Sequence, residues 1–409
     1  MALAPTGSRE IDEWPIGRLD VQELSRNGWR PIPIQQYILK IHSRCNLACT
    51  YCYVYQMDDQ SWRSRPRRMA DETLGAAAER VCHHAVTHRL DRIEIVLHGG
   101  EPLLTGPDFL RKVVSTLRAS LPPGTALTVT VQTNGVLLDT PTLDALLELG
   151  IRVGVSLDGG EATHNRYRRY PDGRTSFADV ERGLRLLGGA RYRRIYAGIL
   201  CTVDLEEDPL KAYEQLLDFE PPRLDFLLPH GDWTRRPPGR GPDLTTPYAD
   251  WLGSLFDRWY VARRPRPGIR LFEEILQLLI GGRSRSELVG LSPAALLVVE
   301  TDGAIEQVDT LRSAYAGATA TGLNVFENSI DDALTHPGVV ARQIGVQALA
   351  DECRRCSIGA VCGGGYYGHR YRAGEGFRNP SVYCPDLFAL VQRIRATVVA
   401  EVARLSGLG

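Results

Sequence analysis

The stretch QYILKIHSRCNLACTYCY, residues 36–53, joins a run of apolar and β-branched residues directly to three cysteines. Its first eight residues have the composition of a β-strand. Cys45, Cys49 and Cys52 follow on the next loop with the spacing C-x3-C-x2-C. Clustered cysteines in a reducing compartment indicate metal binding or catalysis before disulfides.

Length and composition narrow the class of protein. A chain of 409 residues is long enough for two domains, or for one large barrel with an appendage. The net charge is −1, so no overall positive field predicts a nucleic-acid partner. No apolar run approaches the roughly 20 residues of a membrane span. The beginning, MALAPTGSREIDEWP, lacks the pattern of a secretory signal, so we expect a cytoplasmic protein.

From residue 36 onward, strand patterns alternate with helix patterns, which predicts parallel βαβ units. Six such units predict an α/β fold built on a partial (β/α)6 barrel, with the active site at the carboxyl ends of its strands. The expected strands are 36–43, 92–100, 126–135, 152–159, 194–204 and 223–231, and the expected helices are 72–89, 107–121, 140–150, 176–190 and 208–219.

The remaining chain suggests four regions. Residues 1–35 form an N-terminal extension with a short amphipathic helix at 19–29, and residues 36–235 form the barrel. A segment rich in proline and glycine then leads into a helical bridging region, 236–290. Residues 291–409 form a second domain that carries four more cysteines and ends in a helix at 386–405.

The first three cysteines lie where a barrel has its catalytic face. Three thiolates cannot close a tetrahedral structural zinc site unaided, although His42 could supply a fourth ligand. They can hold three irons of a cubane iron–sulfur cluster and leave the fourth iron open to a small molecule.

This cysteine loop resembles that of the radical S-adenosylmethionine (SAM) enzymes, in which C-x3-C-x2-C follows the first barrel strand. HGGEP, residues 98–102, ends the second expected strand and is similar to the family's GGEP motif. Gly99 and Gly100 permit close backbone approach to a ligand. Glu101 and nearby carbonyls can accept hydrogen bonds from the ammonium group of methionine. The alternative for HGGEP alone is an ordinary turn between strand and helix.

Further motifs of the same family follow in order, QTNG at 132–135 and SLDG at 156–159. The resemblance implies that SAM is bound by Tyr51, Gly99, Gly100, Glu101, Asn134, Ser156, Asp158 and Arg168. Arg168 would grip the SAM carboxylate, for which an arginine offers two parallel hydrogen bonds. Arg166 and Arg169 are alternatives for that role.

The C-terminal cysteines, Cys353, Cys356, Cys362 and Cys384, resemble the second half of a SPASM domain. Four cysteines can ligate one complete 4Fe–4S cluster, and a structural zinc site is the alternative. A full SPASM domain has seven cysteines and two auxiliary clusters. Here Tyr366 and Val308 stand at two positions where cysteine is expected. We therefore expect two 4Fe–4S clusters in the chain, one that binds SAM and one auxiliary.

Asp309 stands where related peptide oxidases carry a general base, which makes it the candidate catalytic residue. An aspartate in a loop is more often a turn residue. Glu306, Tyr366 and His369 are alternative bases.

The segment CGGGYYGHRYRAGEGFRNPSVYCPDL, residues 362–387, narrows the resemblance to the cyclophane-forming radical SAM/SPASM peptide maturases. Such enzymes join an aromatic side chain to a nearby Cβ in a ribosomally synthesised precursor peptide. The implied partners are that peptide and an external electron donor of the flavodoxin or ferredoxin type. Other peptide modifications remain alternatives: thioether formation, epimerisation and sulfatase-type maturation. A non-catalytic metal-binding scaffold that recognises a peptide is an alternative of another class.

Overall fold

The computed structural model describes residues 13–241, 243–262 and 266–406. The first twelve residues of the expected N-terminal extension and parts of the expected bridging region lie outside these ranges. Within them, no helix is long and apolar enough to cross a membrane.

One ten-stranded sheet organises the chain, in the order β10-β9-β8-β1-β2-β3-β4-β5-β6-β7. The run β8-β1-β2-β3-β4-β5-β6-β7 is parallel throughout, and only β9 and β10 are antiparallel to their neighbours. The strands are β1 (Gln36–His42), β2 (Arg92–Gly99), β3 (Ala126–Thr133), β4 (Arg152–Ser156), β5 (Tyr196–Thr202), β6 (Arg223–Leu227), β7 (Gly268–Ile269), β8 (Leu296–Val299), β9 (Ala304–Glu306) and β10 (Ala320–Asn324).

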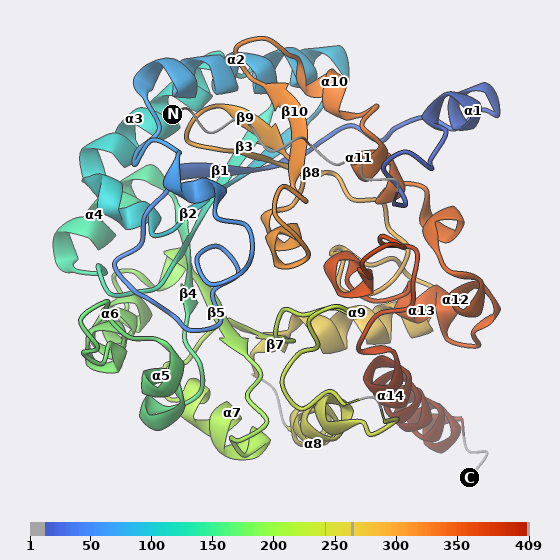
Figure 1. The fold of residues 1–409 in the computed structure, drawn as a ribbon. Coiled ribbons are helices and arrows are strands. Elements are labelled where there is room, and N and C mark those ends of the chain that lie inside the picture. The colour runs from blue at the N-terminus through green and yellow to red at the C-terminus, as the bar shows by residue number, and fades with distance from the viewer. Residues whose placement is uncertain (1–12, 242, 263–265, 407–409) are drawn as a thin grey trace, which may run out of the picture.

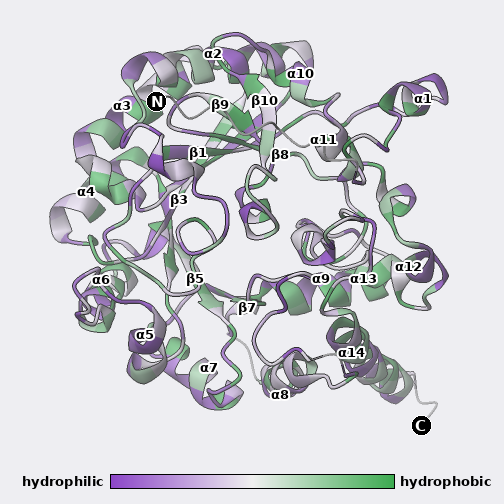
Figure 2. Ribbon diagram, viewed as in Figure 1, coloured by the Kyte–Doolittle hydropathy of each residue, from purple (hydrophilic) through white to green (hydrophobic). Residues whose placement is uncertain are grey.

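Helices follow most of the parallel strands and cover the outside of the sheet (Figure 1). In the barrel they are α2 (Asp71–Thr87), α3 (Gly106–Ser120), α4 (Thr140–Leu149), α5 (Glu161–Tyr167), α6 (Phe177–Gly188) and α7 (Pro209–Leu217). Apolar and polar residues alternate along these helices (Figure 2), and the buried residues of α3 and α6 are all apolar or glycine. The predicted α/β fold with a partial barrel is therefore confirmed.

The helix α3 illustrates why these segments fold as they do. Its buried residues Phe109, Leu110, Val113, Val114 and Leu117 recur every three to four positions, which is the spacing of one helix face. Strand β2 has the other period, with Ile93, Ile95 and Leu97 buried at every second position.

The C-terminal region shares the sheet of the barrel. Strand β8 pairs in parallel with β1, Ile38 opposite Val298 and Leu39 opposite Val299. The sheet therefore continues across residue 291, where the sequence pattern suggested a domain boundary. The segment after β8 is carried to the carboxyl end of β1, beside the first cysteines.

A second apolar core joins the two ends of the chain. It contains Trp14, Leu311, Val340, Tyr367 and Phe377. The amide of Phe377 donates to the carbonyl oxygen of Trp14 at 2.9 Å. The short helix α1 (Val21–Arg26), expected at 19–29, is half exposed beside this core.

The helices α8 (Pro247–Val261), α9 (Arg270–Leu279) and α14 (Cys384–Leu405) pack together beyond β7. Short elements complete the C-terminal region: α10 (Ile330–Ala333), α11 (Pro337–Ala341), α12 (Asp351–Arg355), α13 (Gly359–Cys362) and the 3-10 turns η4 (Asp309–Ser313) and η6 (Tyr367–Arg370). Asp386 of α14 accepts hydrogen bonds at its Oδ1 atom from the amides of Tyr248, at 2.9 Å, and Ala249, at 3.1 Å. A side chain from the last helix thus caps the first turn of α8.

Replacing Asp386 with alanine tests this cap. The change leaves two buried amides without an acceptor, which should lower the free energy of unfolding by about 1–3 kcal/mol. Asp386→Asn keeps an oxygen acceptor and serves as the matched control. Urea unfolding of the three proteins measures the difference, and equal stability of the alanine and asparagine variants would contradict the capping role.

Candidate active site

The cysteine loop leaves β1 at the carboxyl edge of the sheet, as predicted. Cys45, Cys49 and Cys52 are half-buried and form no disulfide. Burial raises the pKa of all three thiols, that of Cys45 to about 12, and Glu101 and the two other cysteines add to the effect on Cys45. Such thiols stay protonated at neutral pH unless a metal centre replaces the protons.

A zinc ion and a cubane cluster require different distances between the three sulfurs. Among the described residues, the only group in which three ligand atoms of His, Cys, Asp or Glu all lie within 4.8 Å is found elsewhere in the chain. A tetrahedral zinc ion with Zn–S bonds of about 2.3 Å would hold its sulfurs about 3.8 Å apart. A cubane spreads its thiolates farther, because each binds a different iron. The Nδ1 atom of His42 faces the carbonyl oxygen of Arg44 at 2.9 Å, and among the described residues His42 belongs to no group of three ligand atoms that lie within 4.8 Å of one another.

The glycines of HGGEP admit the backbone of the cysteine loop. A Cβ atom on Gly99 would lie 2.0 Å from the carbonyl oxygen of His42, and one on Gly100 would lie 2.3 Å from that of Arg44. The amides of Gly100 and Glu101 donate to the same two carbonyls at 2.8 and 2.9 Å. The close approach that the glycines permit is therefore made to the protein's own chain, which fixes the loop against β2.

Glu101 is fully buried and ties β2 to β3. Its carboxylate accepts hydrogen bonds from the amide of Leu103 at 3.0 Å, the hydroxyl of Thr133 at 2.8 Å and the amide of Asn134 at 2.8 Å. Burial raises the pKa of Glu101 to about 6 in spite of these donors. Asn134 in turn reaches the cysteine loop, donating to Asn46 at 2.7 Å and lying 3.6 Å from the sulfur of Cys45.

The structure distinguishes the three arginines that the sequence left as alternatives. Arg168 is 8% exposed, and its guanidinium donates to the hydroxyl of Tyr51 at 2.7 Å. Arg166 is half exposed and pairs with Asp204 and Glu206. The guanidinium group of Arg169 donates a hydrogen bond to the carbonyl oxygen of Gly173. Of the three, Arg168 is the one whose guanidinium group contacts the side chain of a residue in the cysteine loop.

Tyr51 links Arg168 to Asp158 at the end of β4. Its hydroxyl donates to the Oδ2 atom of Asp158, and Oδ1 of Asp158 accepts from the amide of Thr202 at 3.0 Å. The Nε atom of Arg168 is buried and unpartnered, so this guanidinium keeps a donor for an anionic group. Ser156 bonds the side chain of Gln132 at 2.9 Å, on the neighbouring strand.

The backbone fixes the position of Arg168 as well. The amides of Ala48 and Thr50 in the cysteine loop donate to the carbonyls of Arg169, at 2.8 Å, and Tyr167, at 3.1 Å. The predicted SAM-binding residues therefore gather around the first cysteines. Which of them contact SAM stays a prediction.

The four C-terminal cysteines line one cavity of about 80 Å³. Cys353 lies in α12, Cys356 directly follows it, Cys362 ends α13 and Cys384 begins α14. Burial raises the pKa of Cys353 to about 11 and that of Cys362 to about 12, and neighbouring cysteines of the set add to both. As at the first loop, no three of these sulfurs lie within 4.8 Å of one another.

Arg370 lies beside these cysteines and was missed by the sequence analysis. It is 8% exposed, and its guanidinium donates to the carbonyls of Gly363 at 2.7 Å and Gly365 at 3.1 Å. Its charge favours the thiolate forms of Cys353 and Cys362. The only sequence signal was its place in GGGYYGHRY, where three glycines with positive φ make the turn that exposes these carbonyls.

Asp309 lies at the barrel mouth, 3% exposed, at the start of η4. Its Oδ2 atom lies 2.9 Å from Nζ of Lys40 and accepts a hydrogen bond of 2.9 Å from the hydroxyl of Tyr53. Burial would raise the pKa of Asp309, but Lys40 and these hydrogen bonds outweigh it and hold the pKa well below its usual range. Tyr53 directly follows Cys52, so Asp309 is connected to the cysteine loop.

A buried ionic cluster lies next to Asp309. Arg312 bonds Asp59 at 2.8 Å, Glu300 at 2.9 Å and Glu306 at 2.6 Å. Arg65 bonds Glu300 at 2.6 Å and also pairs with Glu306. The cluster joins the segment after the cysteine loop to the segment after β8, and it occupies Glu306, which the sequence had offered as an alternative base.

The other alternative bases, Tyr366 and His369, meet edge to face at 5.2 Å between ring centroids. The hydroxyl of Tyr366 bonds Thr310, and both ring nitrogens of His369 are buried without a partner. Burial keeps the pKa of His369 well below its ordinary value.

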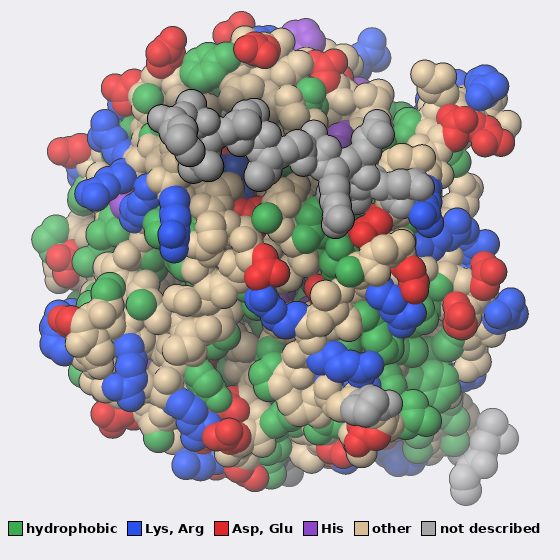
Figure 3. Space-filling model, viewed as in Figure 1, with side chains coloured by type: hydrophobic (Ala, Val, Ile, Leu, Met, Phe, Trp, Pro, Cys, Tyr) green, Lys and Arg blue, Asp and Glu red, His purple; other side chains and the backbone are tan. Residues whose placement is uncertain are grey.

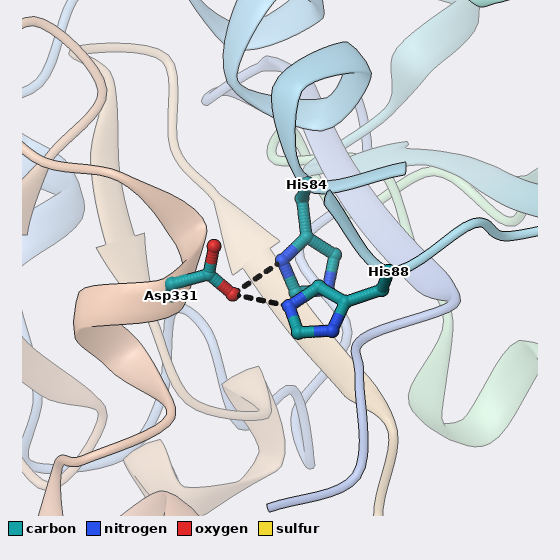
Figure 4. A group of neighbouring side chains, drawn as sticks. All are labelled: His84, His88 and Asp331. Carbon is teal, nitrogen blue, oxygen red and sulfur yellow. Dashed lines mark hydrogen bonds and ion pairs between the residues drawn. The ribbon is translucent and has the colours of Figure 1, made fainter. Parts of the chain in front are cut away.

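The compact trio of ligand type elsewhere in the chain is His84, His88 and Asp331 (Figure 4). His84 Nδ1 and His88 Nε2 lie 2.9 and 2.6 Å from the same oxygen of Asp331. His84 Nε2 accepts a hydrogen bond from the amide of Ile34, so the proton of the neutral ring is on Nδ1. A metal would need the lone pair that this proton occupies. The trio is therefore a structural link between α2, α10 and the approach to β1.

Comparisons with known proteins agree with this geometry. A sequence model of the Radical SAM superfamily matches residues 39–216. A cysteine-type anaerobic sulfatase-maturating enzyme of Clostridium perfringens is 29% identical over 283 residues, 68% of this chain and 74% of the relative. A serine-type enzyme of the same name from Klebsiella aerogenes is 26% identical over 361 residues, 84% of this chain and 82% of the relative.

Solved structures support the fold. The structure described as native anSMEcpe with bound AdoMet superposes with a TM-score of 0.77 and 24% identity, covering 90% of this chain and 99% of that one. SuiB of Streptococcus suis bound to the precursor peptide SuiA gives a TM-score of 0.56 at 13% identity, covering 89% of this chain and 78% of that one. The Radical SAM superfamily uses a 4Fe–4S cluster and SAM, so these predicted cofactors are confirmed. The number of clusters stays a prediction.

Replacing Cys45, Cys49 and Cys52 together with alanine should abolish reductive cleavage of SAM, because no other described residues offer an open-sided cluster site. The measurement is anaerobic formation of 5′-deoxyadenosine from SAM and a reductant. Retained secondary structure by circular dichroism is the control. Continued formation of 5′-deoxyadenosine by the triple variant would contradict the assignment.

Iron analysis tests the number of clusters. The reconstituted protein should hold about eight irons per chain, four for each cubane. Replacing the four C-terminal cysteines with alanine should halve that number and leave SAM cleavage measurable. A value of about twelve would reveal ligands outside the seven cysteines, and about four irons with bound zinc would assign the C-terminal set to zinc.

Proposed function

Because residues 39–216 match the sequence model of the Radical SAM superfamily, we propose that this chain is a peptide-modifying radical SAM enzyme that joins an aromatic side chain to a nearby Cβ. The observation that carries the proposal is a buried carboxylate, Asp309, bonded to the residue that directly follows the cysteine loop. The substrate class is a ribosomally synthesised precursor peptide, and the electron donor is a one-electron carrier of the flavodoxin or ferredoxin type.

The proposed reaction removes one hydrogen from each of two carbons and forms one carbon–carbon bond. Bound at the cysteine loop, the reduced cluster and SAM supply the radical chemistry that takes the hydrogen atom from Cβ. After the new bond forms, the aromatic ring loses one electron to a one-electron carrier and one proton to a base.

The residues of this chain perform three tasks in that account. The Arg168–Tyr51–Asp158 group orients the anionic end of SAM beside Cys49, using the free Nε donor of Arg168. Burial of the barrel mouth keeps water and other hydrogen donors away from a reactive carbon. Asp309 accepts the proton.

The low pKa of Asp309 is compatible with this role. A ring that has gained a bond and lost an electron is a strong acid, so even a weak base removes its proton. Ionisation matters more than basicity, because only a carboxylate without a proton can accept one. The pairing with Lys40 keeps Asp309 in that form at neutral pH.

Sulfatase-type maturation is the second candidate, and the likeness to sulfatase-maturating enzymes favours it. That reaction oxidises a cysteine or serine side chain, and Asp309 could take the proton in it too. What favours the crosslink is the C-terminal segment 362–387 and the presence of Val308 and Tyr366 at two expected cysteine positions. Thioether formation and epimerisation are further alternatives within the same chemistry.

Product analysis separates these functions. The reconstituted enzyme is incubated anaerobically with SAM, a reductant and two probe peptides. One probe is encoded by a short open reading frame beside the gene, and the other is a serine- or cysteine-containing sulfatase peptide. Crosslinking should remove two hydrogens from the first probe and leave a product that no hydrazide traps, with a new bond to Cβ in its NMR spectrum. A hydrazide-reactive aldehyde on the second probe would overturn the crosslink in favour of sulfatase-type maturation, and SAM that stays intact with either peptide would indicate a non-catalytic scaffold.

Asp309→Asn removes the carboxylate while keeping its size. The variant should still cleave SAM in the presence of the probe peptide but form the crosslinked product about a hundredfold more slowly or slower still, since a general base contributes ~10²–10⁴-fold. Rates of product formation by mass spectrometry measure the effect. Asp302→Asn, a change at a half-exposed aspartate nearby, is the control. A normal crosslinking rate in Asp309→Asn would reduce Asp309 to a turn residue.

A further inference from the structure

Lys40 is a charged residue inside the barrel. It lies in β1 and is 2% exposed, and lysine is almost never fully buried unless its charge is paired. Strand β1 runs between β2 and β8 in the middle of the sheet (Figure 1), so this ammonium group is far from the surface that carries most charged side chains (Figure 3).

Two carboxylates lie near the Lys40 ammonium, and Asp309 is the nearer of the two. Nζ of Lys40 lies 2.9 Å from Oδ2 of Asp309 and 3.9 Å from Oε1 of Glu300. Glu300 already has two closer cations, Arg65 at 2.6 Å and Arg312 at 2.9 Å. Lys40 also lowers the pKa of Glu300, but it is the cation closest to Asp309.

The donors around Asp309 are arranged on one side of its carboxylate. Lys40 and Tyr53 both bond Oδ2, each at 2.9 Å, and Nδ1 of His98 lies 3.9 Å from the same atom. No described residue donates a hydrogen bond to Oδ1. One oxygen is held by the protein, and the other is left for a group that the protein does not supply.

We propose that Lys40 is a positioning residue: it holds Oδ2 of Asp309 in the ionised form and so presents Oδ1 to the peptide as the atom that accepts the proton. This inference rests on the proposed role of Asp309 as the base. It adds a second residue, on the first barrel strand, without which that base would be protonated.

The other groups that face Asp309 cannot replace the charge of Lys40. They are Tyr53 after the cysteine loop, His98 at the end of β2, His230 after β6 and Tyr366 before η6. Burial lowers the pKa of His98, and it lowers that of His230 to about 4, so both rings are neutral near pH 7. Burial raises the pKa of Tyr53 and Tyr366, which are neutral as well.

The charge of Lys40 determines how the ionisation of Asp309 depends on pH. With Lys40 present, the pKa of Asp309 lies below its usual value, and the carboxylate is ionised at every pH from about 5 to about 8. Without Lys40, burial is opposed only by His98 and by the hydrogen bond from Tyr53, so the pKa of Asp309 rises. The carboxyl then takes up a proton as the pH falls through the raised pKa, and the ionised form returns at higher pH.

The direct test needs no substrate. Infrared spectra of the reconstituted full-length holoenzyme, recorded from about pH 5 to about pH 8, report the carboxylic-acid band of Asp309, assigned by its loss in Asp309→Asn. Wild type should show no such band. Lys40→Met, which keeps the length of the side chain without its charge, should show it, because burial then raises the pKa of Asp309 above its usual value and into this pH range. A band in wild type, or none in Lys40→Met, would overturn the proposal.

The rate of peptide modification gives the second readout, with the probe peptide that the wild-type enzyme turns over. Lys40→Met should lose about tenfold in rate for each pH unit below its raised pKa and recover at higher pH. Adding Lys40→Met to Asp309→Asn should cause no further loss. A loss of the same size at every pH would assign Lys40 a purely structural role and contradict the proposal.

Two further variants keep the test decisive. Lys112→Met removes a half-exposed lysine of α3 and should leave the pH profile unchanged. Lys40→Arg keeps the cation and should show no infrared band of protonated Asp309, a result that carries the test if Lys40→Met does not fold. If neither probe peptide is modified, the proposed function fails, while the infrared titration still decides whether Lys40 keeps Asp309 ionised.

Discussion

The parallel pairing of β8 with β1 is the constraint on which the rest of the site depends. It places the segment 300–313 over the carboxyl end of the strand that also delivers the first cysteines. The ion pair between Lys40 and Asp309 depends on that strand pairing, because Lys40 lies in β1 and Asp309 lies in the segment after β8. Without the pairing of β1 with β8, Asp309 would not lie beside the cysteine loop and would lose its contact with Lys40.

Burial explains why the mouth of this barrel needs so many paired charges. Arg65, Arg312, Glu300 and Glu306 are all nearly inaccessible to solvent. Taking such charges out of water costs several kcal/mol for each ion unless partners compensate, so each has at least two. The cluster connects the loop after the cysteines to the C-terminal region, beside Val308, where the sequence lacks the expected cysteine.

The elements that were predictable from the sequence are those with a local signal. The βα alternation predicted the six barrel strands, and the cysteine spacings predicted two sets of ligands, the second of which lines one cavity in the structure. The buried position of Lys40 was not predictable, because a lysine in the strand QYILKIHS is expected to face solvent. Its partner Asp309 lies more than 250 residues away in the sequence. Strand β8 was missed for the same reason: its four residues carry no period, and only the pairing with β1 defines it. The choice of Arg168 over Arg166 and Arg169 also needed the structure, since all three share one short segment.

Transfer of a hydrogen isotope tests the central claim most directly, namely that the cysteine loop and the peptide react within one chamber. The reconstituted enzyme is given a probe peptide deuterated at its Cβ positions, and the 5′-deoxyadenosine formed is analysed by mass spectrometry. The account predicts one deuterium in 5′-deoxyadenosine for each peptide modified. Modified peptide accompanied by unlabelled 5′-deoxyadenosine would contradict it.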